Sequence, residues 1–175
     1  RLDEGIEALN AYAQIASRVS ALSGVVPQVS LVLGPCGGIA SALAGMTDIV
    51  VMSKNGALFV NGPMVVSAAA GKDVSLDEIA GTQASIKSGM ASLAAETDEE
   101  EVALARTLLG MLPVNNMDEA IGMAQDDVNR EAPALNAIES LDDVKTVVSA
   151  VADLGAYVEL GEDFAPSMVT ALAKI

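Results

Sequence analysis

The most informative stretch of this chain is Gln28-Val29-Ser30-Leu31-Val32-Leu33-Gly34-Pro35-Cys36-Gly37-Gly38. Its first half, residues 28–33, is an apolar run typical of a strand buried on both faces. The glycine turn 34–38 then leads into a helix of small residues, predicted over 39–46. Backbone N–H groups at such a turn can converge on an anion or on a developing oxyanion. A tight turn without any ligand is the other interpretation, because glycine-rich turns are common in α/β folds.

Signals on both sides of this stretch extend the α/β pattern. Over residues 3–22, apolar residues recur at three- and four-residue steps, which predicts an amphipathic helix with the apolar face Ile6, Leu9, Ala13, Ala16 and Val19. Two strands are predicted at 48–53 and 57–60, and the Asn55-Gly56 pair between them predicts a tight hairpin. The small-residue run 64–70 predicts a further helix.

Two capping boxes mark the starts of later helices. Ser75-Leu76-Asp77-Glu78 begins a short helix, and Thr97-Asp98-Glu99-Glu100 begins one that runs to Leu112 before Pro113 stops it. The segment 114–136 is predicted to be a linker, because polar residues are scattered there among weakly apolar ones. Within residues 137–175, Ser140-Leu141-Asp142-Asp143 is predicted to begin a helix through Val151, and 157–160 and 168–175 are predicted to be the first strands of a new sheet.

Composition excludes several classes of function. A net charge of -15 repels phosphate backbones, so nucleic acid is not an expected partner. With one Cys and no His, the chain cannot assemble a disulfide framework, an ordinary zinc cluster or a Ser-His or Cys-His nucleophile pair. Aromatics make up only 2%, so the core must be aliphatic and methionine-rich. No run is apolar enough to span a membrane, which predicts a soluble, cytoplasmic protein.

Two other candidate features have simpler interpretations. Cys36 has no visible base beside it, so a small buried thiol is favoured over a nucleophile. The acidic run Glu99-Glu100-Glu101 is interpreted as a solvated first helical turn and not as a metal site, because consecutive helical positions do not face one another. No metal is therefore expected.

Several motifs, in order along almost the whole chain, resemble one known family. The family is that of the carboxyltransferase subunits of biotin-dependent acyl-CoA carboxylases and decarboxylases, such as propionyl-CoA carboxylase β chains and the α chains of methylmalonyl- and glutaconyl-CoA decarboxylases. The matching motifs are Arg1-Leu2-Asp3-Glu4-Gly5, Ser23 to Cys36, Thr47-Asp48, Phe59-Val60-Asn61-Gly62-Pro63, Lys87-Ser88-Gly89-Met90-Ala91, Val158-Glu159-Leu160 and Ala165 to Ile175.

The resemblance implies a partial crotonase-like (ClpP/crotonase) ββα spiral. By the same comparison, residues 1–113 are the later part of the acyl-CoA-binding domain, 114–136 a linker and 137–175 the start of the biotin-side domain. The implied reaction moves a carboxyl group between carboxybiotin, carried on a carrier domain or subunit, and a coenzyme A thioester. Implied partners are biotin carboxyl carrier protein, biotin carboxylase or decarboxylase-complex subunits and further copies of the chain. The implied location is cytoplasmic or peripheral to a membrane decarboxylase complex.

The resemblance also implies the site residues. The backbone amides of Gly37, Gly38 and Ile39 would form an oxyanion hole, and Arg1, Cys36, Gly62 and Pro63 would contact the substrate. The family loop reads Pro-Cys-Ala-Gly-Gly-Ala, so its second glycine is replaced here by Ile39. Because a β-branched residue resists positive φ, the donor pair could instead be Gly37 and Gly38.

Two other functions stay open at this point. A different crotonase-superfamily acyl-CoA enzyme would need a carboxylate base, and Asp48 is the nearest acidic residue to the loop in sequence. A catalytically inactive assembly subunit is suggested by Ile39 and by the loss of the family's Thr-His pair within 82–88. The chain begins at Arg1 inside a family motif and ends at Ile175 inside a predicted strand, so it is also expected to be a fragment that is inactive by itself.

Overall fold

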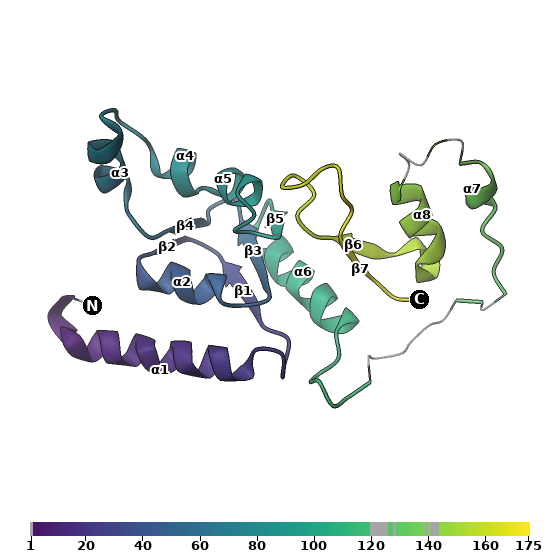
Figure 1. Cartoon of the computed structure of the whole chain (residues 1–175), viewed down its shortest axis with the longest axis horizontal. Coiled ribbons are helices and arrows are strands. Elements are labelled where there is room, and N and C mark those ends of the chain that lie inside the picture. Colours follow the sequence, from purple (N-terminus) through teal and green to yellow (C-terminus); the bar gives the residue numbers. More distant parts are fainter. Residues whose placement is uncertain (1, 120–125, 128, 139, 141–143) are drawn as a thin grey trace.

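The computed structural model describes residues 2–119, 126–127, 129–138, 140 and 144–175 (Figure 1). A parallel sheet at its centre has the strand order β1-β3-β5, with β1 at Val29–Val32, β3 at Ile49–Ser53 and β5 at Leu93–Ala95. Every residue of β3 is buried, as expected for a central parallel strand. The strands predicted at 28–33 and 48–53 are thus confirmed, whereas β5 was not predicted.

The hairpin predicted around Asn55-Gly56 is wrong. The next strand, β4 (Ala57–Phe59), leaves the central sheet and pairs in parallel with β2 (Pro35–Gly37), which itself lies within the predicted turn. Gly56 is required for space and not for a positive φ: a Cβ there would lie 2.4 Å from the Val32 carbonyl oxygen and 3.0 Å from that of Ser53. The chain therefore passes close to the end of β1 and enters a second sheet.

Helices surround the two sheets (Figure 1). The short 3-10 turn η1 (Leu2–Glu4) precedes α1 (Ile6–Leu22), and Gly5 separates them with a φ of 56°. The helices that follow are α2 (Ile39–Gly45), α3 (Pro63–Ala70), α4 (Leu76–Ala80), α5 (Thr82–Lys87) and α6 (Asp98–Met111). Of these, α5 was not predicted.

Both predicted capping sites begin helices. Ser75 and Glu78 form a complete capping box at α4. At α6, the Thr97 side chain accepts from the Glu100 amide, but the Glu100 carboxylate accepts from the Glu96 amide at 2.8 Å and so caps one residue earlier than the standard box.

Two sequence interpretations of helix faces need correction. In α1 the half-buried side chains are Ala8, Tyr12, Ala16 and Val19, while Ile6 and Leu9 from the predicted apolar face are 78% and 57% exposed. In α6, Glu101 is fully buried, so the interpretation of the acidic run as a solvated face is wrong for this residue. It turns inward because it shares a helix face with the buried residues Ala105 and Leu108.

The C-terminal segment packs against the far side of α6 from α1 (Figure 1). It contains α7 (Pro133–Asn136), α8 (Val144–Val151), the turn η2 (Asp153–Gly155) and the antiparallel strands β6 (Tyr157–Glu159) and β7 (Ala171–Ala173). Of the predicted helix start at 140–143, residues 141–143 lie outside the described residues. The apolar residues Val158, Leu160 and Leu172 of the C-terminal segment pack against the cluster around Ile49 and Leu108. None of the described helices combines the length and apolarity needed to cross a membrane.

Candidate functional site

The glycine loop lies between the carboxyl end of β1 and the start of α2. Gly38 is the N-cap of α2 and has φ 65° and ψ −136°, a conformation that L side chains rarely adopt. The buried Ser41 hydroxyl donates to the Gly38 carbonyl at 2.7 Å and lies 3.0 Å from the Phe59 carbonyl. These contacts hold the loop against the end of β4.

Gly37 is required for a close approach. The register of β2 and β4 places it opposite Phe59, and a Cβ on Gly37 would lie 2.5 Å from the phenyl ring. The ring of Phe59 therefore covers the position where any other residue would carry a side chain. This packing fixes the distance between the loop and the second sheet.

The three amides predicted for the oxyanion hole differ in availability. The Gly38 amide donates to the Phe59 carbonyl at 2.8 Å and is therefore occupied. Consecutive N–H groups along a strand point to opposite edges, so the Gly37 amide points away from β4. The Ile39 amide, at the first position of α2, makes no backbone hydrogen bond within the described chain. The N–H groups of Gly37 and Gly38 therefore do not point toward one position. The N–H at the start of α2 that is available to a ligand belongs to Ile39.

Two cavities lie beside this loop. The larger, about 520 Å³, lies between α1, β1 and α2 and is lined in part by Pro35, Cys36 and Ala40. The smaller, about 360 Å³, is lined in part by Ser41 and Phe59. Most of the walls of both cavities are aliphatic, which suits an apolar group more than a charged one.

The other predicted contact residues fall around these cavities. Cys36 is half-buried, and burial raises the pKa of its thiol, so the side chain is a neutral wall residue. Gly62 is the N-cap of α3 and Pro63 its first residue, directly after Asn61, which lines the smaller cavity. The structure thus places Cys36 at one cavity and the Gly62-Pro63 pair next to the other. Arg1 lies outside the described residues.

The sequence interpretation missed one buried acid near the loop. Glu101 lies close to Ser53, at the carboxyl end of β3, and neither its carboxyl oxygens nor the Ser53 hydroxyl has a hydrogen-bond partner among the described residues. Burial raises the pKa of Glu101 and outweighs the opposing effect of the nearby Val32 and Ser53 backbone groups and of the Ser53 hydroxyl. Glu101 lines neither cavity beside the loop. Its position three residues before the apolar pair Leu104 and Ala105 was the available signal for burial.

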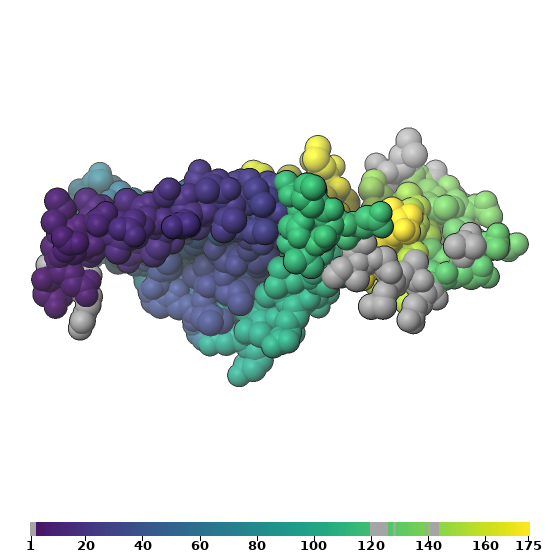
Figure 2. Space-filling model, turned by 90° about the horizontal axis from the view of Figure 1, so that it is seen from below, coloured from purple at the N-terminus to yellow at the C-terminus, as the bar shows by residue number. Residues whose placement is uncertain are grey.

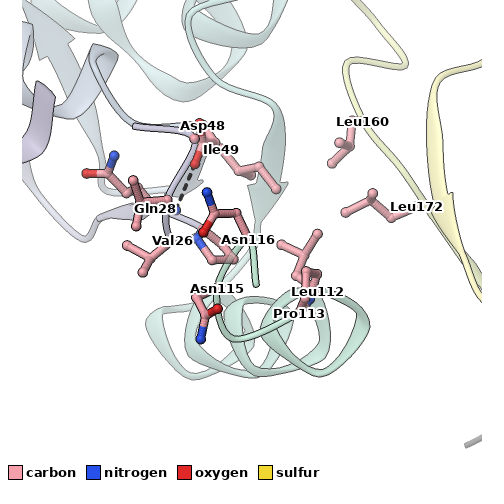
Figure 3. Close-up of a pocket in the computed structure, with 13 residues that line it drawn as sticks. Val26, Gln28, Asp48, Ile49, Leu112, Pro113, Asn115, Asn116, Leu160 and Leu172 are labelled. Carbon is pink, nitrogen blue, oxygen red and sulfur yellow. Dashed lines mark hydrogen bonds between the residues drawn. The ribbon is translucent and has the colours of Figure 1, made fainter. Parts of the chain in front are cut away.

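Asp48, the acidic residue nearest the loop in sequence, lies elsewhere. It precedes β3 at the amino end of the central sheet, where its carboxylate accepts from the Gln28 amide at 2.8 Å. It lines a third cavity, shown in Figure 3. Within the described residues, no three His, Cys, Asp or Glu side chains come close enough to hold a metal ion.

Comparisons with known proteins identify relatives for the whole chain. The model of the carboxyl transferase domain family matches residues 1–175. The 12S subunit of methylmalonyl-CoA carboxyltransferase from Propionibacterium freudenreichii subsp. shermanii is 35% identical, over 100% of this chain and 34% of its own length. Methylmalonyl-CoA decarboxylase subunit alpha from Veillonella parvula is 35% identical, over 99% of this chain and 36% of its own length. The chain thus spans about a third of the length of these curated relatives.

A solved structure shows the same fold. The crystal structure of transcarboxylase 12S with hydrolysed methylmalonyl-coenzyme A bound superposes with a TM-score of 0.93 at 34% identity, covering 100% of this chain and 35% of that one. Transcarboxylase 12S assembles there as a hexamer, and substrate binds to this multienzyme core. The α/β class predicted from the sequence is confirmed.

Proposed function

Because the chain belongs to the carboxyl transferase domain family and has its crotonase-like α/β fold, we propose that it takes part in carboxyl transfer between biotin and an acyl-CoA. The names of its relatives support this reaction class, since one is a methylmalonyl-CoA carboxyltransferase and another a methylmalonyl-CoA decarboxylase. The observation that carries the proposal is the glycine loop, with an available helix-start amide beside an aliphatic cavity.

The larger cavity beside the loop is the proposed acyl site. Its walls near the loop are Pro35, Cys36 and Ala40, which are small enough to leave room for a short acyl chain. Cys36 acts there as a contact residue, because the raised pKa of its thiol keeps it protonated. Gly62 and Pro63, beside the smaller cavity, are proposed to contact another part of the same substrate.

The loop amides are the proposed oxyanion hole. The Ile39 N–H is available to a developing enolate oxygen, and the Gly37 N–H, which points away from β4, is the second candidate. Gly38 is proposed to act by its conformation, because its amide is held by Phe59. One such donor typically contributes about 3 kcal/mol to the stabilisation of a transition state.

Among the described residues, no carboxylate lines the two cavities beside the loop, which favours this reaction over that of a hydratase or isomerase. A hydratase or isomerase would need an acid or base facing the substrate. Neither Asp48 nor Glu101 lines the two cavities beside the loop. Within the described residues, the loop thus offers amide donors and an apolar wall, which suits stabilisation of an enolate.

The remaining roles follow from the family. We propose that residues 1–113 supply the acyl-CoA side, that 114–136 link them to the next part, and that 137–175 begin the biotin side. Biotin on a carrier would supply the carboxyl group. The proposed partners are biotin carboxyl carrier protein, biotin carboxylase or decarboxylase subunits and further copies of the chain. The proposed location is cytoplasmic or peripheral to a membrane decarboxylase complex.

The test removes one amide without changing the helix. Proline lacks an N–H but is tolerated at the first position of a helix, so Ile39→Pro deletes the proposed donor. We expect carboxyl transfer from methylmalonyl-CoA, measured in the native complex, to fall about a hundredfold. Ile39→Ala keeps the amide and should retain most of the activity.

Other results would support the two rival functions. Hydration of crotonyl-CoA by the chain would favour a different crotonase-superfamily enzyme. Titration calorimetry that detects no binding of propionyl-CoA or free CoA to a correctly assembled complex would favour an inactive assembly subunit. Equal losses in Ile39→Pro and Ile39→Ala would show that the Ile39 amide is not the donor.

A further inference from the structure

A cavity of about 300 Å³ opens at the amino end of the central sheet (Figure 3). We call it the amino-end pocket; its lining includes Val26, Pro27, Ile49, Leu112, Leu160 and Leu172. At about 3.3 Å per residue, the extended chain from Gln28 to Gly34 separates the pocket from the loop by roughly 20 Å. The pocket is therefore distinct from the proposed acyl site.

Residues from three regions of the fold form its walls. Residues 24–28 and 48–49 come from the start of the sheet, 112–116 follow α6, and Leu160 and Leu172 come from the β6–β7 region. The Asn116 amide donates to the Val25 carbonyl at 2.8 Å and so joins two of these segments. Ile49, Leu112, Leu160 and Leu172 also belong to one core cluster. The pocket is thus an opening into the hydrophobic core at the junction of these segments.

The polar groups of the pocket are few, and most of them are occupied. Asp48 accepts from the Gln28 amide, and the Gln28 side chain donates to the Val19 carbonyl. The Asn115 side chain bonds to the backbone and carboxylate of Asp118. By contrast, the Asn116 side chain makes no hydrogen bond to any described residue, and it lies among the lining side chains in Figure 3. One carboxamide, which both donates and accepts, is therefore available to a ligand.

Charge narrows the class of ligand. The Asp48 carboxylate lies on the rim of the pocket, and the whole chain carries a net charge of -15. Both features repel an anion such as a fatty acid. A cation would gain attraction at the rim but would lose hydration against the aliphatic walls. A neutral molecule with an aliphatic body and one hydrogen-bonding head fits these walls, because it is not repelled like an anion and does not lose hydration like a cation.

We propose that the amino-end pocket binds a small neutral amphiphile of this kind, whose aliphatic chain packs between Ile49, Leu160 and Leu172 while an amide head pairs with the Asn116 side chain. Two amide groups can exchange a pair of hydrogen bonds, which gives the head its specificity. Such a ligand would contact the sheet, the segment after α6 and the β6–β7 region at once. Its binding would therefore hold the C-terminal segment to the sheet. This inference does not depend on the proposed carboxyl transfer.

The experiment compares ligands of matched length on the purified chain. Hexanamide is the main probe, hexanoate has a similar chain with a negative head, and acetamide has the head alone. By isothermal titration calorimetry we expect saturable binding of hexanamide at one site. Hexanoate and acetamide should each bind at least tenfold more weakly. Hexanamide should also raise the midpoint of thermal unfolding, because it binds only the folded chain.

Two variants locate the binding. Val26→Phe fills the pocket and should weaken hexanamide binding at least tenfold. Val60→Phe is the matched control, because Val60 is 70% exposed and does not line this pocket, and it should bind as the wild type does. If Val26→Phe fails to fold, Asn116→Leu removes the head partner at an exposed position and should also lower affinity.

Three results would overturn the proposal. The first is a folded wild-type chain that does not bind hexanamide saturably. The second is equal affinity for hexanamide and hexanoate, since this would remove the role of the rim charge. The third is unchanged hexanamide affinity in folded Val26→Phe or in Asn116→Leu, because the ligand would then lie elsewhere.

Discussion

At the scale of single residues, the burial of Glu101 makes the stability of the folded chain depend on pH. Its raised pKa means that the folded chain holds the proton more tightly than the unfolded chain does. In the unfolded chain the carboxyl ionises near its ordinary pKa of about 4.3. As the pH rises above that value, the unfolded state loses its proton first, so stability falls until the folded-state pKa is reached. The stabilising contribution of this group is thus fully present only at low pH.

Glu101→Gln should remove this loss of stability, because glutamine resembles the protonated acid and does not titrate. We expect the variant to be at least as stable as the wild type at pH 7 and to lose less stability between pH 4.5 and pH 7. The measurement is urea unfolding across that range. Glu99→Gln, at an exposed position of the same helix, controls for the general effect of removing a charge. Parallel pH profiles for wild type and Glu101→Gln would contradict the prediction.

A second residue-scale prediction concerns two glycines. Gly37→Ala would bring a Cβ to 2.5 Å from the Phe59 ring, so the ring or the β2–β4 pairing must shift. We expect a loss of about 1–3 kcal/mol of stability, as for other overpacked sites. Gly110→Ala is the matched control, because no atom lies within 4 Å of its added Cβ and it lies inside α6. It should stabilise by about 0.5–1 kcal/mol. Denaturant unfolding of both variants tests the contrast, and equal changes would refute the role of Phe59.

At the scale of elements, helix starts were predictable because their signals are local. Ser75 and Thr97 cap α4 and α6 through contacts within four residues of sequence. Pairing partners were not local: Asn55-Gly56 has the sequence of a hairpin turn, yet β3 and β4 enter different sheets because the Gly56 backbone passes against Val32. The position of the glycine loop could likewise be predicted, but the occupation of the Gly38 amide by Phe59 depends on β4 and could not.

The Thr97 side chain caps α6, and its contribution to stability can be measured. Thr97→Ala removes the side-chain oxygen that accepts from the Glu100 amide at 3.1 Å. The expected cost is about 1 kcal/mol of stability, the usual value for an N-cap threonine. Thr107→Ala changes the same residue type in the interior of the same helix and should be nearly neutral, since alanine favours helix. Chemical denaturation measures both, and a Thr97→Ala variant as stable as Thr107→Ala would show that the cap adds nothing.

At the scale of the whole molecule, residues 137–175 were predicted to begin a second domain. That division stays a proposal. In the structure, Val158, Leu160 and Leu172 pack against the same cluster as Ile49 and Leu108, so the two parts share apolar surface. These contacts join residues far apart in sequence, and neither periodicity nor composition shows which apolar positions of two segments will meet. The amino-end pocket could not be predicted for the same reason.

The outer surface of the molecule indicates self-association. α1 forms a long ridge along one face in Figure 2. On α1 and at α3, large apolar side chains reach solvent, with Ile6 78%, Leu9 57%, Met64 85% and Val65 58% exposed. Large apolar side chains exposed in this way favour contact with another protein surface. The net charge of -15 opposes contact between identical chains, and salt screens that repulsion.

We therefore expect the purified chain to form oligomers whose population rises with salt. Sedimentation velocity at about 0.02 M and 0.5 M NaCl measures this, since the screening length falls from roughly 20 Å to about 4 Å over that range. The double substitution Ile6→Lys and Leu9→Lys should shift the chain toward monomer. Burying a lysine at an apolar contact costs far more free energy than burial of the original isoleucine or leucine contributes. Glu7→Gln with Asn10→Lys makes the same net change of charge in the same helix without removing an apolar side chain, so it should not dissociate the oligomer. A wild-type chain that stays monomeric at both salt concentrations would show that these exposed side chains do not drive association.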